Sequence, residues 1–329
     1  MTQHNQSRDR EGAEQQDLET MKRQSSRAAS RDPMGREDRR DFWLFISPWV
    51  VGFLLFGLGP IVASLVLSFM QWDIFRSPGW VGSSNYREMV FDDPLTAKAI
   101  WNTFFYTVFA VPLGTAGSLA VAMLLNTKVR GLAVWRTLYY LPTVVSGVAM
   151  AVIWRWLFNP QIGLLNRMLR PFLRLFDLPD PAWLQSPVLA KPAYVIMSLW
   201  AIGGGMIIFL AGLQSVPQHL YEAAEIDGAG PIRRFRHVTL PIITPVIFFS
   251  LTMGIIGSFQ IFTQAYVMTG AGPENSTLFY VLYLFDNAFR YFRMGYASAL
   301  AWVLFVIIMI VTAVQFAAGR FWVFYEQEA

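Results

Sequence analysis

Six long runs of uncharged, mostly apolar residues constrain the fold of this chain more than any other feature. Each run is long enough for the roughly 20 residues that an α-helix needs to cross the hydrocarbon core of a bilayer. A helix suits this setting because it satisfies its own backbone N–H and C=O groups where no water is present. The predicted spans are about Phe42–Met70, Ala99–Leu125, Trp135–Phe158, Pro192–Leu213, Pro241–Met268 and Tyr296–Phe316. We therefore predict an all-α, polytopic membrane protein with about six transmembrane helices.

The composition agrees with a membrane-embedded chain. Of 329 residues, 54% are hydrophobic and only 15% are charged, whereas about 25% of the residues in soluble domains are charged. The net charge of +4 is too small to indicate nucleic acid as a partner. The chain has no cysteine, which excludes disulfides and thiolate sites, and its histidines, His4, His219 and His237, lack the spacing of metal ligands. We predict no metal site.

The chain divides into a short polar part and a long apolar part. Residues 1–40 are polar, mixed in charge and nearly devoid of aliphatic side chains, which predicts a disordered tail. The apolar run that follows is too long for a signal peptide and lacks a cleavage signature behind it. Residues 41–329 are predicted to form a transmembrane domain, with its core at about 99–317.

A polar segment between the fourth and fifth runs, Tyr221–Pro241, is too regular for a plain loop. Residues Gln218–Asp227 are predicted to form a short helix, because small and apolar side chains recur three or four positions apart. Gly228 stands where a helix needs a residue that tolerates positive φ in order to end. Gly230-Pro231 then starts a second, basic helix over Ile232–His237. The pattern predicts two short helices joined by a sharp bend, which would form a stiff knob beside the membrane.

The same segment matches a known pattern. The pattern begins with Glu222-Ala223-Ala224, and Gly228 follows after three residues. Val238 follows after nine more residues, and Leu240-Pro241 after one more. This spacing resembles the EAA loop of the membrane subunits of binding-protein-dependent ABC importers. The wider phrase is most similar to the carbohydrate-type permeases, which include the maltose, lactose and glycerol-3-phosphate importer subunits. An amphipathic cytosolic loop that only happens to match is the alternative.

Three further phrases resemble the same permeases. They are Trp80-Val81-Gly82 in the first outer connection, Gly163-Leu164-Leu165-Asn166 after the third run, and Tyr266–Pro273 at the end of the fifth run. Many members of this family carry an acidic residue where this chain has Thr263, so the resemblance does not fix the polar lining of the transport path at this position.

The chain has no nucleotide site of its own that a motif can identify. None of Lys22, Lys98, Lys128 and Lys191 follows a glycine, so no phosphate-binding P-loop is present. The resemblance implies that this subunit is not an enzyme and holds no cofactor, and that a partner ATPase binds ATP and Mg²⁺. It also implies a second, homologous permease in a heterodimer, a dimer of cytosolic ABC ATPases and an extracytoplasmic solute-binding protein. The expected cargo is a sugar, an oligosaccharide or a sugar phosphate.

The distribution of basic residues indicates the orientation. Six spans place both termini on one side, and positively charged connections favour the cytosol. The residues that mark this side are Arg36, Arg39, Arg40, Lys128, Arg130, Arg136, Arg233, Arg234, Arg236 and Arg320. The resemblance points the same way, because the ATPase that binds the EAA loop is cytosolic. We expect a multi-pass protein of a bacterial or archaeal cytoplasmic (inner) membrane with both termini in the cytosol.

The resemblance implies that the knob carries force from the ATPase to the spans. A helix with small side chains docks closely into a surface groove, and charged residues contact the rim. The residues expected to couple to the ATPase are Glu222, Ala223, Ala224, Asp227, Gly228, Arg233, Arg234 and Pro241. An equal alternative for the arginines is contact with membrane lipid head groups.

Sugars are held by hydrogen-bonding side chains and by aromatic rings against their C–H faces. The residues inside the spans that best fit this description are Ser146, Trp200, Gly203, Phe259, Gln260, Phe262 and Thr263. The alternative for each one is ordinary helix packing, which also uses small and hydroxyl-bearing residues. Arg155 lies near the outer end of its span and is expected to extend toward the head groups.

Two other function classes are weaker alternatives. A secondary, ion-coupled transporter often needs paired carboxylates inside a span, and the apolar runs contain no such pair. An integral-membrane enzyme would need catalytic groups gathered at one membrane face, where Glu222, Asp227 and His237 are the only candidates. The spacing of these two carboxylates fits a docking helix better than a catalytic pair.

Overall fold

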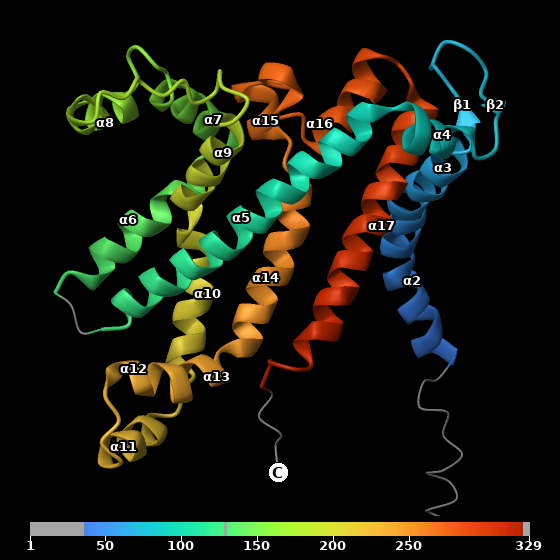
Figure 1. Ribbon diagram of the computed structural model, residues 1–329. Coiled ribbons are helices and arrows are strands. Elements are labelled where there is room, and N and C mark those ends of the chain that lie inside the picture. Colours follow the sequence, from blue (N-terminus) through green and yellow to red (C-terminus); the bar gives the residue numbers. More distant parts are fainter. Residues whose placement is uncertain (1–35, 128–129, 325–329) are drawn as a thin grey trace, which may run out of the picture. The chain divides into compact units, whose positions relative to one another are not determined.

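A computed structural model describes residues 36–127 and 130–324, and nearly all of the regular structure in them is helical (Figure 1). The predicted all-α fold is confirmed. Of the predicted tail, residues 1–40, positions 1–35 lie outside the described residues. The remaining positions, 36–40, belong to the first described helix, which begins at Arg36.

The chain forms two compact units that meet between Ala63 and Ser64. In the first unit the helix α2 (Arg36–Gly52) runs into a π-helical segment, η1 (Phe53–Leu58), and then into α3 (Gly59–Leu67), which extends across the boundary between the units. The Gly59 N–H bonds to the carbonyl of Leu54, five residues back. This wider turn stands directly before Pro60, which has no N–H to donate.

Three described helices are long and apolar enough to cross a membrane without a break: Arg40–Leu67, α5 (Pro94–Leu125) and α17 (Met294–Gly319). Three further pairs of helices are long and apolar enough only when taken together, and each pair is bent at a short break: α6 (Leu132–Val144) with α7 (Gly147–Leu157) at 98°, α9 (Ala190–Ser198) with α10 (Gly203–Gln214) at 49°, and Pro231–Ile242 with α14 (Thr244–Phe259) at 65°. Counting each pair as one span gives six.

The bends are the main difference from the predicted spans. The run predicted as Pro241–Met268 is not one helix, because α14 ends at Phe259 and α15 (Thr263–Met268) starts after a non-helical stretch. The remaining elements of the second unit are β1 (Met70–Gln71), β2 (Gly79–Trp80), α4 (Ser84–Arg87), η2 (Glu88–Asp92), α8 (Leu164–Leu175), η3 (Leu199–Ala201), α11 (Gln218–Ile226), α12 (Pro231–Arg234), η4 (Phe235–Thr239), α13 (Leu240–Ile242), η5 (Pro273–Asn275), α16 (Tyr280–Phe285) and η6 (Asp286–Arg290). The strands β1 and β2 form one antiparallel hairpin.

The sharpest bend, between α6 and α7, has a local cause. Pro142 lies in the last turn of α6, and Val145 is extended with φ −69° and ψ 131°. Ser146 then caps α7, because its Oγ accepts a hydrogen bond from the Ala149 N–H at 3.3 Å. Proline near the end of one helix and a serine cap at the start of the next define two helices in place of a single straight one.

The break between α9 and α10 is supported by a neighbouring helix. The Ser118 hydroxyl of α5 donates a hydrogen bond to the carbonyl of Ile202 at 2.8 Å. A Cβ placed on Gly203 would lie 2.0 Å from the carbonyl oxygen of Tyr139. The break is therefore possible because a hydroxyl satisfies a backbone group there, and because α10 approaches the backbone of α6 without a side chain between them.

The largest cluster of buried side chains packs α5 against α9 and α16. Phe279 belongs to this cluster and makes two edge-to-face ring contacts. Its ring centroid lies 5.6 Å from that of Tyr106 and 5.2 Å from that of Tyr194. A second cluster joins α5 and α10 nearer the other end, around Met206, Phe209 and Ile243. The helix α5 thus contributes to both clusters.

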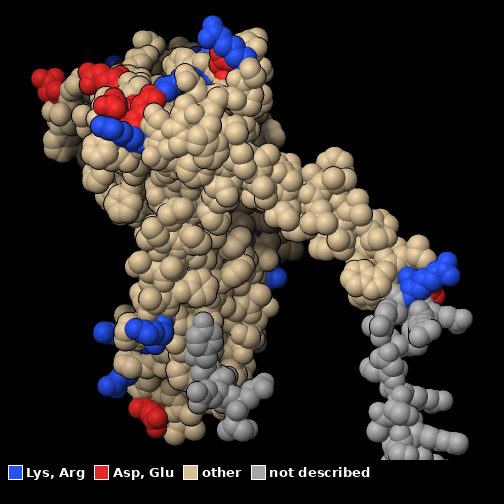
Figure 2. All heavy atoms as spheres, turned by 90° about the vertical axis from the view of Figure 1, so that its right-hand side faces the viewer, with Lys and Arg blue, Asp and Glu red and all other residues tan. Residues whose placement is uncertain are grey.

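Most charged side chains of the second unit lie toward its two ends, and few lie in the band between them on the face shown in Figure 2. This distribution is expected for a protein whose middle lies in hydrocarbon, because unpaired charges there are costly.

One carboxylate joins three elements at the start of α5. Asp93 Oδ2 accepts hydrogen bonds from the hydroxyls of Tyr283 and Tyr296, each at 2.5 Å. Asp93 also caps α5 by accepting from the Leu95 N–H at 2.9 Å and from the Thr96 hydroxyl at 2.8 Å. Burial raises the pKa of the Asp93 carboxyl, but these hydrogen bonds together outweigh burial and hold its pKa below the ordinary value.

We predict that Asp93→Ala destabilises the second unit. The change removes the cap of α5 and leaves the Tyr283 and Tyr296 hydroxyls without their acceptor, which lowers the free energy of unfolding by about 2–4 kcal/mol. Denaturation of the detergent-solubilised protein measures this. Asp92→Ala, at the exposed neighbouring position, is the matched control, and equal loss in both variants would contradict the role of Asp93.

The stabilisation that Asp93 provides decreases at low pH. Because the folded-state pKa of Asp93 is lowered, its stabilisation is present above the ordinary carboxyl pKa and is lost as the pH falls through the lowered value. The difference in stability between the wild-type protein and Asp93→Ala therefore shrinks on acidification below about pH 4.

Candidate coupling loop and transport groove

The segment from Pro217 to Pro241 forms the predicted pair of short helices with a sharp bend between them. We call it the 217–241 loop. The first helix, α11, ends with two hydrogen bonds: the Gly228 N–H donates to the Glu225 carbonyl at 3.0 Å, and the Ala229 N–H donates to the Ala224 carbonyl at 2.9 Å. Gly228 has φ +72°. This is the Schellman ending, in which the residue after the cap adopts the left-handed conformation that glycine tolerates best.

The second helix is longer than the predicted range Ile232–His237. It starts at Pro231, after Gly230 at φ −66° and ψ 171°, and it continues through η4 and α13 as far as Ile242. In η4 the Leu240 N–H bonds to the carbonyl of Phe235, five residues back. Pro241 follows at once and donates no hydrogen bond, so the widened turn carries the helix past it.

Two side-chain contacts brace the two helices against each other. Arg234 Nη1 of α12 lies 3.1 Å from Glu225 Oε2 of α11. The Tyr221 hydroxyl of α11 lies 2.9 Å from Oγ1 of the buried Thr239 in η4. The ion pair is partly exposed and contributes little on its own. Together with the Schellman ending, however, these contacts fix the angle between the helices.

Two large apolar side chains of the 217–241 loop are almost fully exposed. Ile226 is 86% exposed and Ile232 is 83% exposed. Ala223 is also exposed and lies one turn before Ile226 on α11. The two isoleucine side chains therefore project almost fully from the braced knob. The helix α11 lies at the opposite end of the second unit from α8 (Figure 1).

The residues predicted for coupling all lie in or beside this knob. Among them, Glu222, Ala223, Asp227, Gly228 and Arg233 are exposed, whereas Ala224, Arg234 and Pro241 are partly buried. Asp227 is the C-cap residue of α11. The Arg234 guanidinium has its carboxylate partner within the loop, whereas Arg233 is exposed and has no ion pair with a described residue.

A groove of about 350 Å³ lies between α5, α9, α14 and α15. Its polar lining residues are Tyr106, Thr115, Ser118, Ser198, Ser250, Ser258, Gln260 and Gln264. Gly114 and Gly257 also line it, and a Cβ on either one would meet nothing within 4 Å. These glycines keep the groove wide. Every lining residue is uncharged, so the groove offers neutral hydroxyl and amide groups as hydrogen-bond donors and acceptors.

Of the residues predicted to contact cargo, the groove contains Gln260, which lies exposed in the break between α14 and α15. Phe259 is buried beside it. Phe262 packs against Phe285 at 4.9 Å between ring centroids. Thr263 lies at the start of α15, where its Cγ2 is 3.6 Å from the Cβ position of Gly147.

The other three predicted cargo residues lie elsewhere. Ser146 caps α7, and Gly203 meets the backbone of α6. Trp200 lines a separate cavity of about 280 Å³ together with Trp135 and Tyr139. The hydroxyls of α5 and α14 that do line the groove were not predicted. The signal for them in the sequence is polar side chains inside apolar runs, which also fits helix packing.

The groove is lined by neutral residues throughout. Its lining contains no carboxylate, histidine or lysine that could act as a general acid or base near neutral pH. Within residues 36–127 and 130–324, no group of three His, Asp or Glu side chains is placed to hold a metal ion.

A bundle of bent apolar helices, with a neutral hydrogen-bonding groove between them and a braced knob at one end, defines the membrane-embedded subunit of a transport system. The chain belongs to the family described as the binding-protein-dependent transport system inner membrane component, which matches residues 42–321.

Two relatives and one solved structure illustrate the similarity. The chain is 43% identical over 296 residues to the "Probable ABC transporter permease protein YesP" of Bacillus subtilis strain 168, covering 89% of this chain and 94% of YesP. It is 34% identical over 277 residues to the "Arabinooligosaccharides transport system permease protein AraP" of the same organism, covering 83% of this chain and 86% of AraP. The fold is similar to a chain of a bacterial alginate ABC transporter in complex with an alginate pentasaccharide-bound periplasmic protein, with TM-score 0.74, 21% identity, and coverage of 87% of this chain and 96% of that chain.

We predict that Gly228→Ala loosens the end of α11. A Cβ at this position meets no neighbouring atom, so the effect comes from φ +72° alone and amounts to about 1 kcal/mol. Hydrogen exchange of the Gly228 and Ala229 amides measures it as roughly fivefold faster exchange. Gly230→Ala, with φ −66° and equally open surroundings, is the matched control and leaves the exchange rates unchanged. Unchanged rates in both variants would contradict this account of the bend.

Proposed function

We propose that this chain is the permease subunit of an ATP-driven importer that moves a carbohydrate across the inner membrane. The observation that carries the proposal is the direct connection between the knob and the groove. The second helix of the 217–241 loop is followed, after the bend at Ile243, by α14, and α14 ends at Phe259, directly before Gln260 in the groove. Because α14 has 16 residues, it spans about 24 Å at 1.5 Å per residue.

This geometry supports a mechanical coupling in which movement of the knob moves α14, and we call this coupling the lever. A partner ATPase that closes on ATP would bind Ala223, Ile226 and Ile232 and displace the braced knob as one body. The displacement would pass along α14 to the groove and open it to one side of the membrane or to the other. Hydrolysis would return the knob to its first position. In this proposal ATP and Mg²⁺ are bound by the partner, and this chain supplies the movement.

The lining of the groove supports a neutral, hydroxyl-rich cargo. Hydroxyl and amide side chains exchange hydrogen bonds with sugar hydroxyls, and Tyr106 adds an aromatic ring. The name of AraP refers to arabino-oligosaccharides, and the alginate transporter was solved with an oligosaccharide-bound protein. We infer a sugar or an oligosaccharide for this chain as well.

The partners follow from the same mechanism. We infer a second, homologous permease that completes the transport path, a pair of cytosolic ABC ATPases below the 217–241 loop, and an extracytoplasmic protein that delivers the sugar. The family description names a binding protein as a requirement of the transport system, which supports the last of these.

We infer that the 217–241 loop and both termini face the cytosol. The C-terminal end of α17 returns to the loop end of the second unit, because the Phe324 N–H donates to Thr244 Oγ1 at 2.9 Å. Thr244 is the first residue of α14, directly after the loop. An ATPase that binds the loop therefore lies on the same side as the C-terminal end of α17.

The proposal is tested by purifying this chain in detergent together with the products of neighbouring genes. We expect a co-purifying ATPase whose hydrolysis rate rises several-fold when the sugar-loaded binding protein is added. Solute accumulation against a gradient by vesicles that contain this chain alone would contradict the proposal.

We predict that Gly228→Pro leaves membrane insertion intact but uncouples uptake from ATP hydrolysis. Proline is fixed near φ −65° and cannot adopt the φ +72° of this position, so α11 would lose its angle to α12. Gly230→Pro is the matched control, because Gly230 already has φ −66°. Uptake and hydrolysis are measured together in proteoliposomes, and wild-type uptake by Gly228→Pro would refute the lever.

We predict that Gln260→Ala lowers uptake at limiting substrate by about tenfold, the equivalent of one lost hydrogen bond of about 1.4 kcal/mol. Assembly with the ATPase stays normal, because Gln260 is remote from the loop at the far end of α14. Met253→Ala, at an exposed position of α14 outside the groove, is the control. Equal uptake by the two variants would exclude Gln260 from the transport path.

A further inference from the structure

The helix α8, between the bent pairs α6–α7 and α9–α10, has an exposed apolar edge that the transport mechanism does not use. At 3.6 residues per turn, its apolar side chains occupy one arc and its polar side chains occupy the other. The exposed edge of the apolar arc consists of Leu164, Met168, Phe172 and Leu175, which are 44%, 70%, 62% and 75% exposed.

The inner edge of the same arc packs against the protein. Leu165, Leu169 and Leu173 are partly buried, and Leu165 contacts the main core cluster. One helix therefore presents apolar residues in two directions, inward to the bundle and outward to its surroundings.

The helix is firmly mounted. The amide of the buried Asn166 donates to the carbonyls of Pro160 at 3.2 Å and Pro181 at 3.0 Å, and its Oδ1 accepts from Trp183 Nε1 at 2.7 Å. Arg170 forms an ion pair with Asp180 at 2.9 Å. These contacts fix the segments before and after α8, so the exposed edge has a fixed direction.

The polar arc of α8 carries an uncompensated positive charge. The helix contains Arg167, Arg170 and Arg174 and no acidic residue. Arg170 is paired, whereas no carboxylate of the described residues lies within ion-pair distance of Arg167 or Arg174. An exposed apolar edge beside free guanidinium groups is the pattern of a helix that lies in a phospholipid surface.

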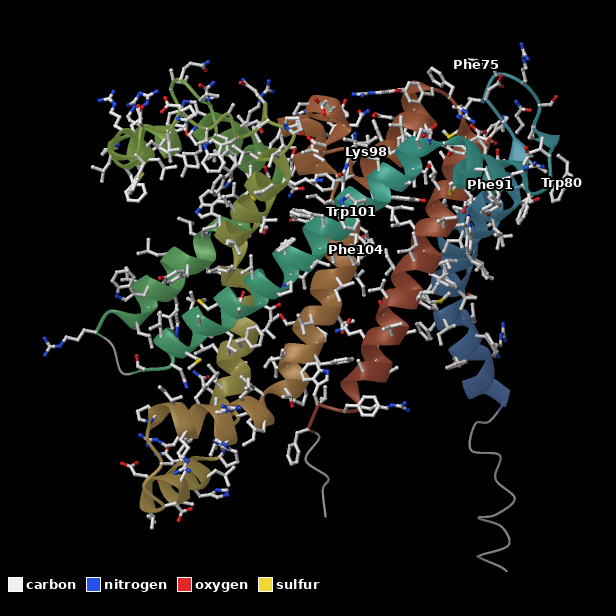
Figure 3. All side chains as sticks on the ribbon, viewed as in Figure 1. Phe75, Trp80, Phe91, Lys98, Trp101 and Phe104 are labelled. Carbon is white, nitrogen blue, oxygen red and sulfur yellow. The ribbon has the colours of Figure 1, made fainter. Side chains whose placement is uncertain are left out.

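Exposed aromatic side chains lie at the end of the second unit that carries α8. Trp80, Phe91 and Trp101 are 67%, 76% and 58% exposed there. Figure 3 shows Trp101 on α5, with Lys98 nearer the start of the helix and with Trp80 and Phe91 at the same end. Exposed aromatic rings gather where hydrocarbon meets water, and basic side chains lie beyond them. Figure 1 places α8 at this end.

We propose that α8 lies flat in the membrane surface, with Leu164, Met168, Phe172 and Leu175 among the lipid acyl chains and with Arg167 and Arg174 bound to phospholipid phosphate groups. The connection between the two bent pairs is thereby held at a fixed depth. This proposal does not depend on the identity of the cargo or on the direction of transport.

The absence of cysteine from the sequence makes the test direct. Single nitroxide labels are attached at Met168→Cys, Phe172→Cys and Arg174→Cys in the full chain, reconstituted in phosphatidylglycerol and phosphatidylethanolamine vesicles. Collision rates with oxygen, which concentrates in lipid, are compared with those of a water-soluble nickel chelate present on both sides. We expect oxygen to exceed nickel several-fold at positions 168 and 172 and the reverse at position 174.

Ile226→Cys is the matched control, because it is an equally apolar and exposed position on α11, where we expect free access of nickel when no ATPase is present. Nickel access at position 172 equal to that at 226 would overturn the proposal, because the edge would then face water. Low collision rates with both reagents at 168 and 172 would also overturn it, because another protein surface would then cover α8.

The phosphate contacts are tested separately. With the label at Phe172→Cys, the double variant Arg167→Gln with Arg174→Gln is expected to lower the oxygen-to-nickel ratio several-fold. An unchanged ratio would overturn the assignment of the two arginines to lipid phosphate.

Discussion

The structure depends on one constraint: in an apolar environment, each backbone N–H and C=O must find a partner inside the protein. Straight helices meet this constraint alone, but three of the six candidate spans in the described residues are helix pairs bent at a short break. Each bend therefore needs help from its surroundings. The Ser118 hydroxyl bonds to the carbonyl of Ile202 at the break in the fourth span. Likewise, the amide of the buried Asn102 donates to the carbonyls of Asn275 and Leu278 in the segment before α16.

The same bends position the groove and the 217–241 loop. The break after Phe259 exposes Gln260 to the groove, and the bend at Ile243 turns α14 away from the 217–241 loop. A continuous fifth span would contain neither of these features. The broken geometry thus gives the bundle a polar groove in its middle and a knob at its end, with α14 connecting the two.

The apolar runs and the 217–241 loop could be predicted because their signals are local. Hydrocarbon thickness sets the length of a span, and positive φ sets the choice of Gly228. The bends and the groove could not be predicted in the same way. Gly203 resembled a cargo contact in the sequence, yet it lies where α10 meets the backbone of α6. Ser198 and Ser250 lie in different elements, and only the packing of α9 and α14 beside α5 brings them into one groove. The bond between Asp93 and Tyr296 joins residues 203 positions apart, and no local pattern predicts it.

The central claim is that the braced knob transmits the movement of a partner ATPase. Site-directed crosslinking of Ala223→Cys tests it most directly, because the rest of the chain contains no cysteine. In the assembled, transport-active complex, the account predicts that a short thiol-reactive crosslinker joins position 223 to the ATPase and blocks uptake. An active complex in which position 223 forms no crosslink to the ATPase, and instead reacts with a membrane-impermeant reagent added outside the cell membrane, would contradict it.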